Sequence, residues 1–309
     1  MPSMVFFPSG VLVSGSSGLL GSHICAALER DSRPEFARVD VRDVSALATL
    51  ATRWRPDVIL PLASKGTVLA PLGGLPEMLD VAVDGLLHLL RVFTPKKVIF
   101  PSSCAVYGDT QMMAASPSSP LNPISVYGLS KVISERVLQQ WAAETRNTAV
   151  ILRIGNLVGR GSRGLIGYLA NHALRYPDGN PPAEMRGAGC MVRDFVPVDY
   201  VARVFEQAIG QKWNPGEAHI LNVGSGKPRT NEQVASVVQQ TLSKAGLALK
   251  IHFHDRSGAG EASTVVLDTQ ETVRRLGIDP PTGAEVTQAI REAVHFYIDR
   301  TRTTKSASA

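Results

Sequence analysis

A tyrosine and a lysine, Tyr127 and Lys131, stand four residues apart in a segment with the periodicity of a helix. Side chains at this separation share one helix face, which brings the phenol beside the ammonium group. A free tyrosine has a pKa of roughly 10 and is no base at neutral pH, but a neighbouring cation favours the phenolate. Ser103, at the end of an apolar strand pattern, could hydrogen-bond the same substrate hydroxyl. Singly, each could be an ordinary surface residue; together they predict acid–base chemistry on a hydroxyl group.

Glycines three residues apart, Gly15, Gly18 and Gly21, follow the β-branched run Val11–Val13 and open a helical pattern that reaches Arg30. In such a strand–turn–helix unit the first glycine permits a tight turn and the second lets the backbone approach a pyrophosphate. The third lets the helix pack on the strand, and the helix N-terminus adds N–H donors and a positive dipole end. The spacing differs from the ordinary G-x-G-x-x-G fingerprint, and similar turns occur without a ligand. Alone, the turn is therefore a weak indication of a dinucleotide site.

The elements that must position these residues are patterns rich in valine and isoleucine alternating with helical patterns. The predicted strands are 11–13, 39–41, 57–60, 97–100 (ending at Ser102 and Ser103) and 149–153, and the predicted helices 44–54, 76–93 and 127–145. This alternation predicts an α/β fold with a doubly wound parallel sheet.

After Asn156 the composition changes to Gly/Pro-rich loops around one short helix. Further strands are predicted at 194–197, 218–223 and 250–253, with a helix at 200–209 and two or three amphipathic helices between 230 and 296. We expect 10–155 to form a dinucleotide-binding domain to which 199–223 returns. Residues 156–198 and 224–300 would form a smaller C-terminal substrate-binding lobe over the carboxyl ends of the strands, where open α/β sheets bind ligands. Residues 301–309 are predicted to be a frayed or disordered tail.

Composition narrows the class of protein. The 309 residues are 44% apolar and 19% charged, which excludes general disorder. The 32 basic and 27 acidic residues are scattered, a balance that fits an acidic small molecule at least as well as nucleic acid. Three cysteines without a CxxC spacing predict neither a disulfide framework nor a zinc site. No apolar run approaches the roughly 18 residues of a membrane span, and residues 1–10 lack the basic start of a signal peptide. We expect a cytoplasmic protein with neither nucleic acid nor membrane as a partner.

Six motifs stand in one order along the chain: Gly15–Gly21, Asp40–Asp43, Pro101–Gly108, Tyr127–Lys131, Arg193–Val196 and Asn222–Gly226. From Val11 to about Tyr297 the chain resembles the extended short-chain dehydrogenase/reductases, the NAD-dependent nucleotide-sugar epimerase/dehydratase family. The combination is specific for this family and not for one of its reactions. The resemblance implies a Rossmann-type sheet, NAD as cofactor and a nucleotide-diphosphate sugar as substrate.

The resemblance also implies roles for individual residues. Tyr127 would take the proton of a sugar hydroxyl as hydride leaves to the nicotinamide, Lys131 would hold the nicotinamide ribose and lower the tyrosine pKa, and Ser103 would orient the hydroxyl. The cofactor-binding residues would be Gly15, Ser17, Gly18, Leu19, Leu20, Gly21, Asp40, Val41, Leu62 and Ala63, with Tyr127 and Lys131. The substrate-binding residues would be Ser103, Cys104, Asn156, Leu165, Arg193 and Arg256. For Arg193 an ion pair with Asp194 is the alternative.

This chain departs from the family pattern in the interval between Gly21 and Asp57. The family has a strand ending in an acidic residue that holds the adenosine ribose and then a separate D-x-R-D segment, whereas this chain has room for only one. Asp40 fits the adenine-contacting aspartate better than the ribose carboxylate, so the ribose clamp would be missing and adenosine affinity weak. A basic surface loop explains the nearby Arg33, Arg38 and Arg42, but these also leave NADP open. Smaller departures are Ala82, where asparagine is typical, and Val126, where proline is common.

Residues next to Ser103 and at position 165 narrow the choice among the reactions of this family. Cys104 and Ala105 stand where the family's dehydratases carry Asp-Glu, which argues against dehydration. The 3,5-epimerase/reductases need a Cys/His pair, but Cys104 lies one residue too early and Leu165 takes the histidine's place; Cys104 then reads as a small buried apolar residue. A minimal Ser-Tyr-Lys set is what a 4-epimerase needs. An NAD(P)H-dependent 4-keto-sugar reductase and a non-catalytic dinucleotide or sugar-nucleotide binder are the alternatives.

The resemblance further implies a homodimer through a four-helix bundle built from the helices at 76–93 and 127–145. The candidate apolar contacts are Leu86, Leu90, Val132 and Leu138. The alternative is that these residues simply cover the sheet.

Overall fold

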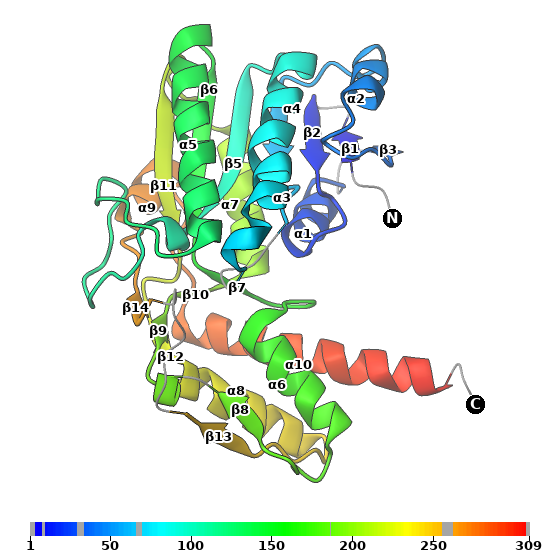
Figure 1. The fold of residues 1–309 in the computed structure, drawn as a ribbon, viewed down its shortest axis with the longest axis vertical. Helices are drawn as coiled ribbons and strands as arrows, with labels where there is room; N and C mark the ends of the chain where they lie inside the picture. The colour runs from blue at the N-terminus through cyan, green and yellow to red at the C-terminus, as the bar shows by residue number, and fades with distance from the viewer. Residues whose placement is uncertain are drawn as a thin grey trace.

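The computed structural model describes residues 4–7, 10–29, 34–65, 70–185, 187–254 and 262–306. At its centre lies a seven-stranded sheet in the order β11-β6-β5-β4-β2-β1-β3 (Figure 1). Its parallel strands are β2 (Val11–Ser14), β4 (Val58–Pro61), β5 (Lys97–Ser103), β6 (Thr148–Ile154) and β11 (Ala218–Val223). They are largely buried runs rich in Val and Ile, as expected of strands covered on both faces. The predicted doubly wound α/β sheet is confirmed.

Helices form a layer on each face of this sheet. One layer contains α1 (Leu19–Leu28) and α7 (Val198–Gly210), and the other contains α2 (Val44–Ala51), α4 (Gly85–Phe93) and α5 (Val126–Thr145). Successive residues of a strand point to opposite faces. On β5, Ile99 packs into the core with α1 and α7, whereas Val98 and Phe100 pack against α4 and α5.

The leucines predicted as dimer contacts belong to the second layer. Leu86, Leu90 and Leu138 are buried against Val98 and Phe100. Val132 packs, partly buried, against the cluster that contains Cys104, Val106 and Tyr107. The prediction that the three leucines face a partner is therefore wrong, and they cover the sheet instead.

The N-terminal strand occupies an inner position of the sheet. β1 (Met4–Phe7) pairs antiparallel with β2 on one side and with β3 (Glu35–Ala37) on the other. The prediction of a strand at 39–41 is wrong. The chain turns here instead, because the Asp43 N–H donates to the Asp40 carbonyl and the Asp43 carboxylate then caps α2. Within the described residues, β3 is thus the only strand between α1 and β4. The place beside β2 is filled by β1 from the chain's own N-terminus.

The helix predicted at 76–93 is interrupted. α3 (Leu75–Leu79) leads into a π-helical segment, Asp80–Asp84, before α4 begins. The Ser134 hydroxyl on α5 donates to the Ala82 carbonyl of this segment at 3.1 Å. A Cβ on Gly85 would lie 2.5 Å from the Val41 side chain, so the turn at 38–43 can reach this helix only because residue 85 is a glycine.

A second lobe lies below the sheet in Figure 1, where β6 continues into β7. Its small sheets pair β7 (Asn156–Val158) with β10 (Phe195–Pro197), β8 (Ala183–Met185) with β13 (Ile251–Phe253), and β9 (Val192–Arg193) with both β12 (Arg229–Thr230) and β14 (Thr264–Val265). Its helices are α6 (Gly164–Arg175), α8 (Asn231–Lys244) and α10 (Gly283–Ser306). These helices share a hydrophobic core separate from that of the sheet. The short α9 (Gln270–Leu276) lies beside β11 instead, where Thr272 Oγ1 donates to the Asn222 carbonyl at 2.6 Å.

The end of α10 differs from the prediction for the C-terminal tail. Residues 301–306 continue the helix, and the Thr301 and Thr303 hydroxyls donate to the carbonyls of Tyr297 and Asp299 one turn back. Extending a helix that has already formed costs little per residue, so a tail without apolar periodicity can remain helical. Of the described helices, none has the length and apolarity needed to cross a bilayer.

Candidate active site

The turn between β2 and α1 brings backbone atoms closer than side chains would allow. Gly15 has a φ of 69°, and a Cβ on it would lie 2.5 Å from the Ala63 nitrogen. A Cβ on Gly21 would lie 2.3 Å from the Gly15 carbonyl oxygen. Gly18 is the N-cap of α1 and offers no side-chain cap. The first turn of α1 therefore directs backbone N–H groups and a positive dipole end outward, which fits the pyrophosphate of a dinucleotide.

The other predicted cofactor residues lie around this turn. Ser17 is exposed, and Leu19 and Leu20 are half-buried in the first turn of α1. Leu62, also half-buried, donates its N–H to the Ser14 carbonyl at 3.2 Å, which ties the end of β4 to the end of β2. Leu62 and Ala63 thus lie against the glycine turn, as the predicted cofactor site requires.

The side expected to hold adenosine is built differently from the family pattern. The Asp40 carboxylate accepts hydrogen bonds from the Arg42 backbone N–H at 3.0 Å and from its guanidinium at 3.0 and 2.6 Å. These bonds lower the pKa of Asp40 to about 2. Val41 is buried, and its carbonyl lies 3.0 Å from His88 Nδ1. No residue from 1 to 7 is acidic, so β1 brings no ribose carboxylate to the place beside β2.

Ser103 is the last residue of β5 and therefore lies at the carboxyl end of the parallel strands. Ser103 caps the short 3₁₀ helix η4 (Cys104–Val106), its Oγ accepting the Ala105 N–H at 3.2 Å. A Cβ on Gly128 would lie 2.5 Å from the Ala105 carbonyl oxygen, so a glycine is what lets α5 approach η4 this closely. The approach places the Tyr127 phenol close enough to the Ser103 side chain for that side chain to oppose the rise of the tyrosine pKa. The structure thus brings the predicted Ser-Tyr pair together.

Lys131 lies one helical turn beyond Tyr127 and is buried. Its Nζ donates to the Pro101 carbonyl at 2.8 Å and lies 5.7 Å from the centre of the Tyr127 ring. Val126, the first residue of α5, takes the place where the family carries proline. The helix still begins there because the Ser125 hydroxyl caps it by accepting the Gly128 N–H at 3.1 Å.

Burial governs the electrostatics of this pair. It raises the pKa of Tyr127 to about 12, against the opposing hydrogen bond from Ser103. It lowers the pKa of Lys131 to about 8, against the attraction of Glu135. The prediction that Lys131 lowers the tyrosine pKa is therefore not met by these side chains alone. A phenolate at neutral pH requires further positive charge at the site.

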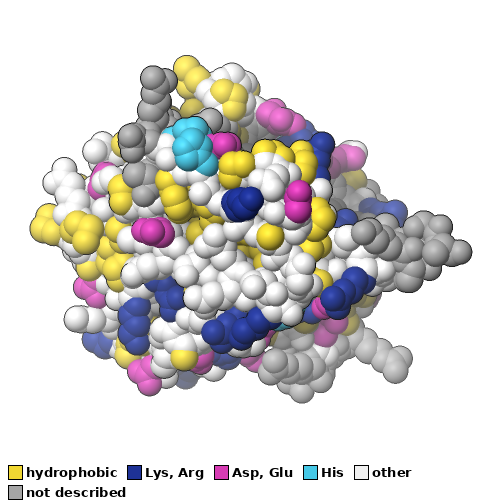
Figure 2. All heavy atoms as spheres, turned by 90° about the horizontal axis from the view of Figure 1, so that it is seen from below, with side chains coloured by type: hydrophobic (Ala, Val, Ile, Leu, Met, Phe, Trp, Pro, Cys, Tyr) yellow, Lys and Arg dark blue, Asp and Glu magenta, His cyan; other side chains and the backbone are white. Residues whose placement is uncertain are grey.

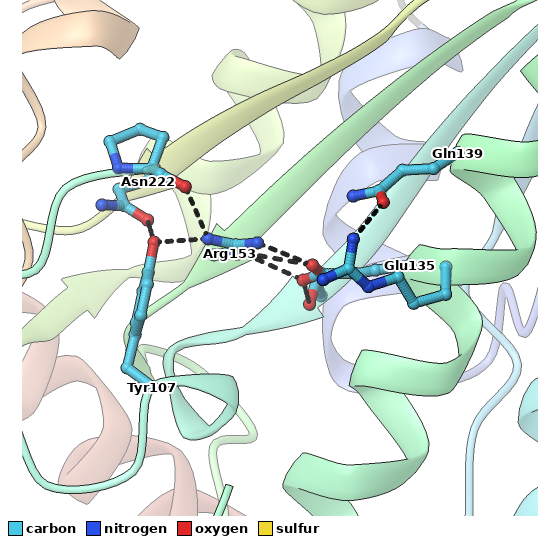
Figure 3. Close-up of polar contacts among 8 residues, drawn as sticks. Tyr107, Glu135, Gln139, Arg153 and Asn222 are labelled. Carbon is cyan, nitrogen blue, oxygen red and sulfur yellow. Dashed lines mark hydrogen bonds and ion pairs between the residues drawn. The ribbon is translucent and has the colours of Figure 1, made fainter. Parts of the chain in front are cut away.

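A buried polar network, which sequence reasoning missed, joins α5 to β6 and to Tyr107 (Figure 3). The Arg153 guanidinium lies between the Glu135 carboxylate, at 2.8 Å, and the Tyr107 hydroxyl, at 2.9 Å. The Ser102 hydroxyl also donates to Glu135, and Tyr107 donates to Asn222 at 2.6 Å. One signal for this network is present in the sequence. Arg153 is a charged residue within the apolar strand predicted at 149–153 and must find a buried partner.

The residues predicted to bind substrate differ in what surrounds them. Asn156 is exposed at the start of β7, and Leu165 is half-buried in the first turn of α6. Cys104 is buried, and burial raises the pKa of its thiol to about 11, which keeps it a neutral thiol. This agrees with Cys104 as a small buried apolar residue. Arg256 lies outside the described residues.

Arg193 is held by backbone carbonyls. Its guanidinium donates to the Ala262 carbonyl at 2.6 Å and to the Val192 carbonyl at 2.9 Å. The alternative of an ion pair with Asp194 is wrong. The buried Asp194 carboxylate accepts instead from the N–H and hydroxyl of Ser225, both at 2.7 Å, and from the Gly226 N–H at 3.0 Å.

Comparison with known proteins gives matches along most of the chain. The family described as "NAD dependent epimerase/dehydratase family" matches residues 11–224. A UDP-glucose 4-epimerase of Rhizobium meliloti is 25% identical, over 88% of this chain and 92% of that protein. The UDP-glucose 4-epimerase of Thermus thermophilus, solved in complex with NAD, is 25% identical with a TM-score of 0.79, over 93% of this chain and 98% of that one. A UDP-glucose-4-epimerase from Stenotrophomonas maltophila, with bound NAD and formylated UDP-arabinopyranose, has a TM-score of 0.82 at 21% identity, over 95% and 99% of the two chains.

Proposed function

Because the chain belongs to the NAD-dependent epimerase/dehydratase family, we propose that it is a 4-epimerase of nucleotide-diphosphate sugars. Membership confirms the family, the enzyme class and the NAD cofactor that the motifs predicted. The finer assignment is supported by the closeness of the Ser103 side chain to the Tyr127 phenol and by Lys131, whose Nζ lies 5.7 Å from the centre of the Tyr127 ring. The Rhizobium and Thermus relatives, named as UDP-glucose 4-epimerases, support a UDP-hexose as the substrate.

We assign the cofactor to the cradle formed by the glycine turn. The N–H groups at the start of α1 and the close approach of Gly15 to Ala63 fit its pyrophosphate. NAD supplies the acceptor, and later the donor, of the hydride at the sugar C4. Lys131 would bind the nicotinamide ribose through its ammonium group. Arg42 is already paired with Asp40, which favours a cofactor without a 2′-phosphate.

The acid–base work falls to Tyr127. Its Oη would take the proton of the C4 hydroxyl and return it after the 4-keto sugar has turned its opposite face toward the cofactor. Ser103 Oγ would hold that hydroxyl in line by a second hydrogen bond. With a pKa raised to about 12, Tyr127 needs both the Lys131 ammonium and the cationic nicotinamide to become a base near pH 7. Asn156, Leu165, Arg193 and Arg256 remain the proposed contacts of the nucleotide-diphosphate sugar.

Tyr127→Phe tests this assignment, with Tyr176→Phe as a matched control at a half-buried position on the second lobe. The wild type should interconvert UDP-glucose and UDP-galactose without added cofactor and release NAD on denaturation. Tyr127→Phe should keep the NAD and lose about 10²–10⁴-fold in kcat, the usual contribution of a general acid–base. Consumption of NAD(P)H with a 4-keto sugar, without interconversion, would identify the reductase instead. Ligand binding without turnover in the wild type would identify a binder.

We also propose that the chain forms a homodimer through α5 and that it acts in the cytoplasm. Leu129 on α5 is 40% exposed, and Ile133 lies one turn further along the same face. Leu129→Asp should convert a dimer to a monomer in light scattering, whereas an unchanged mass would contradict this interface.

The proposed location in the cytoplasm is supported by the cysteines. Cys25, Cys104 and Cys190 are all unpaired, which fits a reducing compartment.

A further inference from the structure

Three side chains of metal-ligand type lie together on the second lobe, outside the proposed active site. Glu184 lies on β8, and His252 on β13 is paired with it in register. His254 follows two residues later, and its backbone N–H donates to the Met185 carbonyl at 2.7 Å, which continues the pairing. Residues two apart on an extended segment project from the same face, and the two imidazole rings are 4.6 Å apart. Figure 2, which views the molecule from below, shows a compact patch of histidine with an acidic side chain beside it.

The potential ligand atoms of these side chains converge. Glu184 Oε2 lies 3.1 Å from His252 Nδ1 and also contacts His254 Nε2. One such atom from each residue lies within 4.8 Å of the others. Zn²⁺ binds imidazole nitrogen and carboxylate oxygen at about 2.0–2.2 Å, which places tetrahedral ligand atoms about 3.3 Å apart. Side chains that are 47–60% exposed can make this adjustment by small rotations.

We propose that Glu184, His252 and His254 bind a divalent transition-metal ion of the zinc type. Two imidazoles and one carboxylate are borderline ligands, which favour Zn²⁺, Ni²⁺ and Cu²⁺ over Mg²⁺ and Ca²⁺. Three protein ligands leave the fourth position to water. Cysteine spacing predicted no zinc site, and it could not reveal this one because the ligands are two histidines and a glutamate that meet only when β13 pairs with β8.

The expected consequence is a cross-link between β8 and β13. Neither strand contributes a residue to the Ser103, Tyr127 and Lys131 set, so the metal is assigned a structural effect on this lobe and no part in the proton transfer. An ion that binds only the folded state raises the melting temperature, and the rise grows with the logarithm of the ion concentration once this exceeds the dissociation constant. The competing possibility is that the three side chains form a hydrogen-bonded group that binds no metal.

The experiment is calorimetric titration of chelator-treated protein with ZnCl₂. Wild type should bind one equivalent with a dissociation constant on the order of 10 μM or below, an affinity within reach of three ligands. Glu184→Gln and His252→Gln should each weaken binding at least about tenfold, which the loss of outer-shell partners alone can already cause. His295→Gln, at an exposed position on α10, is the matched control and should bind as the wild type does.

Thermal melting distinguishes this site from casual binding. Zn²⁺ should raise the melting temperature of wild type and of His295→Gln but not that of His252→Gln, and MgCl₂ should raise the melting temperature of none of the three proteins. Zinc binding that is equally tight in His252→Gln, or absent from the wild type, would overturn the proposal. Circular dichroism checks that the variants, all of them substituted at exposed side chains, remain folded.

Discussion

The carboxylate of Glu135 and the guanidinium of Arg153 form a buried ion pair one helical turn beyond Lys131. The two side chains are 0% and 3% exposed and are joined by hydrogen bonds of 2.8, 3.0 and 3.3 Å. Glu135 also binds the hydroxyl of Ser102, the neighbour of Ser103. Glu135 therefore connects the helix that carries Tyr127 and Lys131 to β6 through Arg153, and to β5, the strand that carries Ser103, through Ser102.

Glu135→Gln should lower the free energy of unfolding by about 3 to 5 kcal/mol, because it leaves the Arg153 charge buried without its counterion. Glu144→Gln on the same helix is the matched control. Glu144 is exposed, and among the described residues its carboxylate accepts one hydrogen bond, from Gln140 at 2.6 Å, so its loss should cost less than about 1 kcal/mol. Urea denaturation of the three proteins measures the difference. Equal stability of the two variants would show that the buried pair does not hold these elements together.

Lys131→Met should alter how stability depends on pH. The pKa of Lys131 is lowered to about 8 in the folded state from an ordinary value of 10.5 in the unfolded chain. Between these values the unfolded state binds more protons, so wild-type stability gains a rising contribution from about pH 8 to 10.5. Lys131→Met removes that contribution. The wild-type-minus-variant difference in unfolding free energy should become more favourable to the wild type across this window, and a constant difference would contradict the lowered pKa.

Much of the sheet could be predicted from sequence because buried parallel strands are continuous apolar runs. β11 was predicted at its observed bounds, and α5 begins within one residue of its predicted start. The failure at 39–41 has a local cause. Val39 and Val41 have β propensity, but the Asp40 carboxylate bonds to the Arg42 N–H and closes a turn between them.

Contacts between elements that are distant in the sequence could not be predicted from local sequence patterns. Nothing local to β1 indicates that it inserts antiparallel beside β2, since that depends on which sheet position is left open. The Ser-Tyr-Lys set was predicted, whereas the burial that raises the Tyr127 pKa depends on α5 packing against η4. Glu135 and Arg153 lie 18 residues apart in sequence and meet only once α5 and β6 have packed.

Gly21→Ala should damage the cofactor cradle. The added methyl group would lie 2.3 Å from the Gly15 carbonyl oxygen and 2.8 Å from the Ser16 Cα, so the turn must shift. Overpacking of this kind costs about 1–3 kcal/mol, and the shift also moves the N–H groups expected to meet the pyrophosphate. Gly74→Ala is the control, because its Cβ would meet nothing within 4 Å. The NAD content of the purified proteins, measured after denaturation, should fall in Gly21→Ala and stay unchanged in Gly74→Ala; equal content would argue against the assigned site.

Phe7→Ala should destabilise the protein strongly, because β1 is an inner strand of the sheet. Phe7 is 1% exposed and packs in the main core, whereas Phe36 on the adjacent β3 is 56% exposed. Truncating a fully buried phenylalanine costs about 3 to 5 kcal/mol, so the melting temperature should drop by several degrees or more. Phe36→Ala removes the same atoms from the surface and should change the unfolding free energy by less than about 1 kcal/mol. If both variants melt with the wild type, residues 4–7 do not pair between β2 and β3 in solution, and the place beside β2 must be filled in another way.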